Sequence, residues 1–216
     1  MGGETLSLLF SPIKEFLKKG DLLLLSLCLL ASGYGLILIY SATRYTHSYR
    51  DVLVQFVGIF LGGIAYVLLT FVDFRLFISK NWRWVFCASV LLILLLLTPL
   101  GLSVGGNRNW LEISKIIPGF PMNLQPNELV KLPFVLTLAL QMASIQEREH
   151  DLSSFPSLLQ IGGHTLFMLA LIAAVCGDFG MCVVYLFIFV FMAWTAGVKI
   201  RWFVLVGGGI VLTAVV

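Results

Sequence analysis

Long apolar runs, separated by short polar segments, dominate the amino-acid sequence. The six longest runs are Leu22–Tyr40, Val52–Val72, Trp84–Leu100, Leu129–Ile145, Leu158–Cys176 and Met181–Ala196. They do not alternate apolar and polar residues as a membrane strand would, and each is long enough to cross hydrocarbon as a helix. The pattern therefore predicts an all-α, polytopic transmembrane helix bundle with six full spans.

A seventh apolar run, Trp202–Val216, reaches the end of the sequence. As a helix it would extend about 22 Å, which is less than the roughly 30 Å of a hydrocarbon core. A terminal carboxylate inside hydrocarbon is unfavourable. We therefore expect a truncated seventh span and a sequence that is the front part of a longer protein.

The composition supports lipid as the surrounding solvent. Hydrophobic residues make up 59% of the 216 residues and charged residues 12%, whereas soluble domains have about 45–50% and about 25%. The net charge of +3 provides no extensive basic face, so we expect no nucleic-acid partner. We expect residues 1–21 to form a cytoplasmic interfacial segment, and residues 22–216 to form one incomplete transmembrane domain with an outer loop at 101–127.

The basic residues predict the orientation of this domain. A cytoplasmic N-terminus places nine of the fourteen basic residues on the inner side: Lys14, Lys18, Lys19, Arg75, Lys80, Arg83, Arg148, Lys199 and Arg201. Because cytoplasmic loops carry an excess of Lys and Arg, this orientation of a multi-pass protein is favoured.

The expected outer loop contains aromatic and polar residues in a helical pattern. Trp110, Ile113 and Ile117 are spaced at i, i+3 and i+7, which predicts a turn-rich helix lying along the lipid headgroups. Trp110 would then be either an interfacial anchor or a substrate contact.

The segment "QPNELVKL", Gln125 to Leu132, opens the fourth predicted span. Pro126 suits a first helical turn, and Glu128 and Lys131 share one helix face. The two charges form either a local ion pair or part of a wet cavity facing the bundle interior. Asp178, in the turn "CGDFG", is either an ordinary turn residue or a third charged group near the same leaflet. Such groups could hold the phosphates of a lipid-borne substrate.

The sequence has none of the usual metal or dinucleotide motifs. Its four cysteines form no CxxC pair, and its three histidines fall in separate segments. We therefore expect no metal site made by the protein alone.

Several motifs, in their order along the chain, resemble the SEDS family of bacterial membrane proteins, which includes RodA, FtsW and SpoVE. They are "IYSAT", the helix with Gln55, "GGNRNWLEI", "QPNELVKL", and "GDFG" followed by "AGVKIRW". The family usually reads QPSE with a Lys three residues later, so Gln125, Pro126, Glu128 and Lys131 match while Asn127 replaces Ser. The family turn PDLGT is more altered here, with Gly177, Phe179 and Met181 at the changed positions and Asp178 and Gly180 retained.

The resemblance implies a lipid II polymerase, that is, a peptidoglycan glycosyltransferase that acts in elongation, division or sporulation. Such an enzyme works with a class B penicillin-binding transpeptidase and releases undecaprenyl pyrophosphate. The substrate-binding residues that it implies are Gln125, Glu128, Lys131, Arg108, Trp110 and Asp178. Lys131 would offset the leaving-group charge, and Glu128 would orient the acceptor, Lys131 or a divalent cation. The family's catalytic aspartate is expected beyond Val216, so no residue here is assigned as catalytic and the chain alone is expected to be inactive.

Two other functions fit the same sequence. A charged cavity in a membrane bundle is also typical of a flippase for lipid-linked precursors. A scaffold without catalysis could bind the transpeptidase through small-residue surfaces such as Gly58 and Gly62.

Overall fold

The computed structural model describes residues 20–44, 49–120, 122–149 and 151–205. It comprises two compact units, Met1–Asp73 and Phe74–Val216, each described here by itself. The proposed interfacial segment at 1–21 lies almost entirely outside the described residues.

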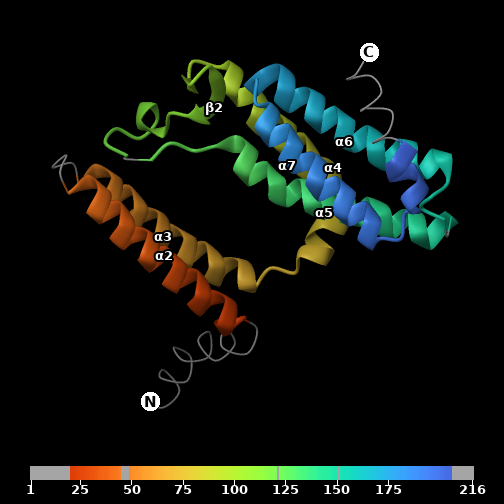
Figure 1. Cartoon of the computed structure of the whole chain (residues 1–216), viewed down its shortest axis with the longest axis horizontal. Helices are drawn as coiled ribbons and strands as arrows, with labels where there is room; N and C mark the ends of the chain where they lie inside the picture. The colour runs from red at the N-terminus through yellow and green to blue at the C-terminus, as the bar shows by residue number, and fades with distance from the viewer. Residues whose placement is uncertain (1–19, 45–48, 121, 150, 206–216) are drawn as a thin grey trace, which may run out of the picture. The chain divides into compact units, whose positions relative to one another are not determined.

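The described chain is a multi-pass helical membrane protein, as predicted (Figure 1). Five of its described helices are long and apolar enough to cross a membrane. They are α2 (Leu22–Thr43), α3 (Arg50–Thr70), α4 (Phe74–Leu94) with the 3₁₀ turn η1 (Leu95–Leu97), α5 (Pro126–Glu149) and α6 (Phe155–Cys176). A sixth apolar helix, α7 (Phe179–Thr195), is shorter at 17 residues. Residues 200–205 are helical, and the rest of the expected seventh span lies outside the described residues. The number of spans and their orientation stay predictions.

Unit Met1–Asp73 contains the antiparallel helices α2 and α3. Asp21 caps α2 by accepting a hydrogen bond from the Leu24 amide (Oδ1···N 3.0 Å). The Tyr66 hydroxyl, near the end of α3, donates to the Asp21 carbonyl at 2.8 Å. No residue of α2 or α3, both described throughout, is buried. An apolar helix pair with this exposure is stable where lipid covers its surface.

Helix α4 extends further than the hydrophobic pattern predicted. The expected run began at Trp84, whereas the helix begins at Phe74 and includes Arg75, Lys80 and Arg83. Each of these basic side chains is at least partly exposed, and long basic side chains near a helix end can reach the membrane surface. A helix can therefore continue through charges that interrupt an apolar run.

The segment 101–127 contains a β-hairpin instead of the predicted turn-rich helix. Strand β1 (Gly101–Val104) pairs antiparallel with β2 (Asn107–Leu111), followed by the short 3₁₀ helix η2 (Ile113–Lys115). Gly105 and Gly106 have φ of 63° and 89°, as the two central residues of a type I′ turn require. The helical spacing of Trp110, Ile113 and Ile117 was therefore a misleading signal, because the Gly-Gly turn sets strand pairing in its place.

The hairpin packs at one end of unit Phe74–Val216, which we call the hairpin end (Figure 1). The last residue of β2, Leu111, belongs to the buried core together with residues of α4, α5, α6 and α7. Its amide donates to the Leu124 carbonyl at 2.7 Å, and the Leu124 amide donates back at 3.0 Å. The hairpin end thus gathers the ends of α4 and α6 and the starts of α5 and α7. We call the opposite end of this unit the far end.

Candidate functional site

Helix α5 begins at Pro126, as the sequence predicted. A proline is suited to this position because the first helical amides have no partner within the helix. The Glu128 amide donates to the Gln125 carbonyl at 3.1 Å, so Gln125 closes the first turn through its backbone. Gln125 itself is half-buried at the hairpin end.

Glu128 and Lys131 form an ion pair one turn into α5. Lys131 Nζ lies 2.8 Å from Glu128 Oε1, and the exposed fractions of the side chains are 24% for lysine and 52% for glutamate. The buried stripe of α5 runs through Asn127, Val130 and Phe134. With 3.6 residues per turn, Lys131 lies next to this stripe, and Glu128 lies further round the helix towards the surface. The pair therefore stands at the boundary between the bundle interior and its surface.

Asn127, the residue that replaces the family's usual serine, is completely buried. Its amide nitrogen donates to Cys176 Sγ at 3.4 Å, at the end of α6. Its carbonyl accepts a hydrogen bond from the buried Tyr185 hydroxyl of α7 at 2.9 Å. The asparagine side chain thus joins the start of α5 to α6, and the backbone of the same residue joins it to α7, directly beside Glu128.

Asp178 is the N-cap of α7 and also holds the hairpin. Gly177, with φ of 68°, ends α6, and Asp178 Oδ1 then accepts from the Met181 amide at 2.9 Å. Its other oxygen, Oδ2, accepts from Asn109 Nδ2 of β2 at 2.7 Å. Both carboxylate oxygens therefore make structural hydrogen bonds. Asn109, which joins β2 to α7, was not singled out from the sequence, although it lies within the quoted motif "GGNRNWLEI".

Arg108 and Trp110 occupy β2 at the hairpin end. Arg108 Nη2 donates to the Thr98 carbonyl at 3.3 Å, which holds the base of the hairpin. Trp110 pairs with Leu102 across the hairpin and is half-buried. Among the described residues, no hydrogen bond joins Arg108 or Trp110 to the Glu128–Lys131 pair. The structure thus brings the predicted site residues to one end of the unit without joining them in one network.

A second Glu–Lys pair with the same spacing lies just after the hairpin. Lys115 Nζ is 2.8 Å from Glu112 Oε2, and it also donates to the Pro99 carbonyl at 2.9 Å. The hydrogen bond from Lys115 lowers the pKa of the Glu112 carboxyl, against the smaller opposing effect of desolvation. Because it shares the sequence spacing and the pair distance, this pair is a matched control for Glu128 and Lys131.

The described residues contain no group of three His, Cys, Asp or Glu side chains that could hold a metal ion. At the hairpin end the chain instead offers the ammonium of Lys131 and the carboxylate of Glu128, both partly exposed. Such groups can bind and orient a phosphate-bearing, hydroxylated molecule.

Comparisons with known proteins give a consistent result. Residues 21–216 match the family model FTSW_RODA_SPOVE, described as "Cell cycle protein". A probable peptidoglycan glycosyltransferase FtsW of Geobacter sp. (strain M18) is 25% identical, over 88% of this chain and 51% of the relative. One of Neisseria gonorrhoeae (strain NCCP11945) is 34% identical, over 70% and 32%. Stage V sporulation protein E of Bacillus subtilis (strain 168) is 27% identical, over 87% and 50%.

A solved structure has a similar fold. Its description reads "Structural coordination of polymerization and crosslinking by a peptidoglycan synthase complex". One of its chains is 25% identical with a TM-score of 0.69, and the match covers 89% of this chain and 52% of that one. This chain therefore spans about half the length, or less, of the proteins that it matches.

Proposed function

Because the chain belongs to the cell cycle protein family of FtsW, RodA and SpoVE, we propose that it forms part of a lipid II polymerase of the bacterial inner membrane. Relatives described as probable peptidoglycan glycosyltransferases support this activity. The complex described for the similar structure supports a class B penicillin-binding transpeptidase as its partner. The sequence motifs described above resemble the same family.

The observation that carries the proposal is the Glu128–Lys131 pair at the start of α5. Lys131 lies beside the buried stripe with 24% of its side chain exposed, so its ammonium can meet a ligand from the bundle side. Lipid II polymerisation releases undecaprenyl pyrophosphate, and positive charge fixed near the departing oxygen stabilises that step. We assign this role to Lys131.

Glu128 has a supporting role in the same proposal. Its Oε1 holds Lys131 Nζ at 2.8 Å, while half of the side chain is exposed. The carboxylate therefore orients the ammonium and has an oxygen left for the acceptor hydroxyl or for a divalent cation bound with the substrate. The same end of the unit is shaped by Arg108, Trp110 and Asp178. Asp178 fixes the hairpin to α7 through its hydrogen bond with Asn109.

The test is polymerisation of fluorescent lipid II by the whole protein that contains this chain, reconstituted with its transpeptidase partner. We expect Lys131→Ala to slow polymerisation about a hundredfold at equal expression, the scale of losing one fixed charge-stabilising group. Lys115→Ala is the control, because it breaks an ion pair with the same spacing and the same 2.8 Å distance, and it should leave the rate within about twofold, as expected of an exposed pair.

Three outcomes would contradict the proposal. Equal rates for the wild-type protein and Lys131→Ala would remove this lysine from the site. Movement of lipid II across vesicle membranes without chain growth would instead support the flippase, and unaltered growth of cells carrying both Glu128→Ala and Lys131→Ala would support the scaffold.

A further inference from the structure

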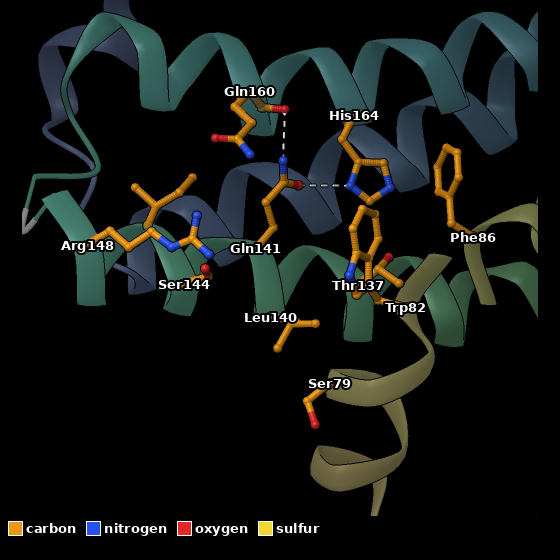
Figure 2. Close-up of a pocket in the computed structure, with 11 residues that line it drawn as sticks. Ser79, Trp82, Phe86, Thr137, Leu140, Gln141, Ser144, Arg148, Gln160 and His164 are labelled. Atoms are coloured by element: carbon orange, nitrogen blue, oxygen red, sulfur yellow. Dashed lines mark hydrogen bonds between the residues drawn. The ribbon is translucent and has the colours of Figure 1, made fainter. Parts of the chain in front are cut away.

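A cavity of about 540 Å³ lies towards the far end of unit Phe74–Val216. Figure 2 shows the side chains that line it. Residues of α4, α5 and α6 line it, among them Trp82, Thr137, Gln141, Ser144, Arg148 and Gln160. No sequence pattern indicates this cavity, because its polar residues are scattered singly through three apolar helices.

A hydrogen-bonded pair of side chains forms the wall between α5 and α6. Gln141 Nε2 donates to the Gln160 carbonyl at 3.2 Å, and Gln141 Oε1 lies 3.0 Å from His164 Nδ1. Since the first bond turns the amide oxygen towards the histidine, Nδ1 carries the proton. The His164 ring also makes edge contacts with Phe86 and Phe134, with ring centroids 5.2 and 5.5 Å apart. This wall is thus fixed in place.

Among the described side chains that line the cavity, Arg148 can only donate hydrogen bonds, while Ser144 and Gln160 can donate or accept them. The side chains of Ser144, Arg148 and Gln160 make no hydrogen bond or ion pair with any described residue, whereas Thr137 already donates to the Pro133 carbonyl at 2.7 Å. Arg148 is the one charged residue among the described residues that line the cavity. Guanidinium and hydroxyl donors, with no carboxylate among them, favour an anion rich in acceptor oxygens.

The position of the cavity indicates where this anion comes from. Arg148 lies in the last turn of α5 and Gln160 near the start of α6, the depth at which lipid headgroups meet a spanning helix. Thr137 lies 11 residues before Arg148, about 16 Å along the axis, so the cavity continues beneath the headgroup layer, past Leu140 and Phe86. A phospholipid fits both parts, with its phosphate at Arg148 and its glycerol backbone deeper.

We propose that this cavity is a binding site for an anionic phospholipid, whose phosphate is held by Arg148 with Ser144 and Gln160. The site is separate from the Glu128–Lys131 pair and does not depend on the function proposed for that pair. It gives the far end of the bundle a lipid that stays bound between α4, α5 and α6.

The test is native mass spectrometry of the chain released from nanodiscs that contain equal amounts of phosphatidylglycerol and phosphatidylcholine. We expect one phosphatidylglycerol to be retained in preference to phosphatidylcholine. Arg148→Gln should reduce this retention about fivefold, the effect of one basic residue on an anionic lipid. Ser144→Phe keeps the charge but fills the cavity, and it should reduce retention at least as much.

Arg75→Gln is the matched control, because Arg75 is exposed at the far end but does not line the cavity. Equal losses for Arg75→Gln and Arg148→Gln would show general attraction between basic residues and lipid, and would overturn the proposal. Unchanged retention in Ser144→Phe would do the same. Release of the bound lipid by millimolar inorganic phosphate would identify a free-phosphate site in place of a lipid site.

Discussion

Two buried side-chain amides hold the hairpin end of unit Phe74–Val216 together. The Asn109 side chain connects β2 to the Asp178 cap of α7. Asn127 connects the start of α5 to Cys176 through its side-chain amide and to Tyr185 through its backbone carbonyl. Buried amides need such partners, because an unpaired polar group in an apolar interior is costly. Lys131 and Glu128 therefore project from a backbone fixed by neighbouring hydrogen bonds.

Removing the Tyr185 hydroxyl should loosen this arrangement. We expect Tyr185→Phe to lower the free energy of unfolding by about 1 kcal/mol, since the Asn127 carbonyl loses a buried donor. Thermal unfolding in detergent measures the change. Tyr34→Phe is the control, because Tyr34 is 65% exposed in α2. Equal midpoints for Tyr185→Phe and the wild-type protein would show that the hydrogen bond contributes nothing.

Asp151 should make the loop between α5 and α6 sensitive to acid. The hydrogen bond from the Ser153 amide is the largest cause that lowers the pKa of Asp151 below its ordinary 3.8, and Lys199 adds to it. A lowered pKa in the folded state stabilises the fold above pH 3.8, and this stability is lost as the pH falls through the folded pKa. Thermal unfolding measured across pH tests this. The difference in unfolding midpoint temperature between the wild-type protein and Asp151→Asn should become smaller below pH 3.8. A difference independent of pH would contradict this.

At the scale of elements, the β-hairpin depends on one close backbone approach. A Cβ added to Gly101 would lie 1.9 Å from the Leu96 carbonyl oxygen and 2.9 Å from Arg108 Nε. The absence of a side chain at Gly101 thus allows β1 to begin close to the end of η1, and leaves room for the Arg108 side chain at the base of the hairpin. The same end of the unit carries the start of α5.

Gly101→Ala tests this approach. We expect it to lower the free energy of unfolding by about 1–3 kcal/mol, the usual range for added atoms in a packed site. Gly62→Ala is the matched control, because a Cβ at Gly62 of α3 has no atom within 4 Å, and it should be neutral or stabilising. Similar unfolding midpoints for the two variants would contradict the close approach.

At the scale of the whole molecule, the excess of basic residues predicts that the hairpin end faces outward. In cells, Ser103→Cys in β1 should react with a membrane-impermeant maleimide, whereas Arg201→Cys, beyond α7, should react only after permeabilisation. Both positions are exposed, and the chain with its native cysteines gives the background. The reverse labelling pattern would place Glu128 and Lys131 on the cytoplasmic side and end the proposed role of this pair with lipid II.

The sequence by itself determined the helical membrane class, the approximate positions of the main helices, the family and the Glu128–Lys131 spacing. The helical class, the helix positions and the Glu128–Lys131 spacing follow from local physics, since apolar runs need lipid and residues three apart share a helix face. The family follows from the resemblance of the sequence motifs. Only the tertiary structure decided the packing of the hairpin against the helix ends, the partners of Asn109 and Asn127, and the cavity at Arg148. Each of these depends on groups from different elements meeting in space: Asn109 and Asp178 are 69 residues apart, and Asn127 and Cys176 are 49 apart. No local pattern encodes such pairings.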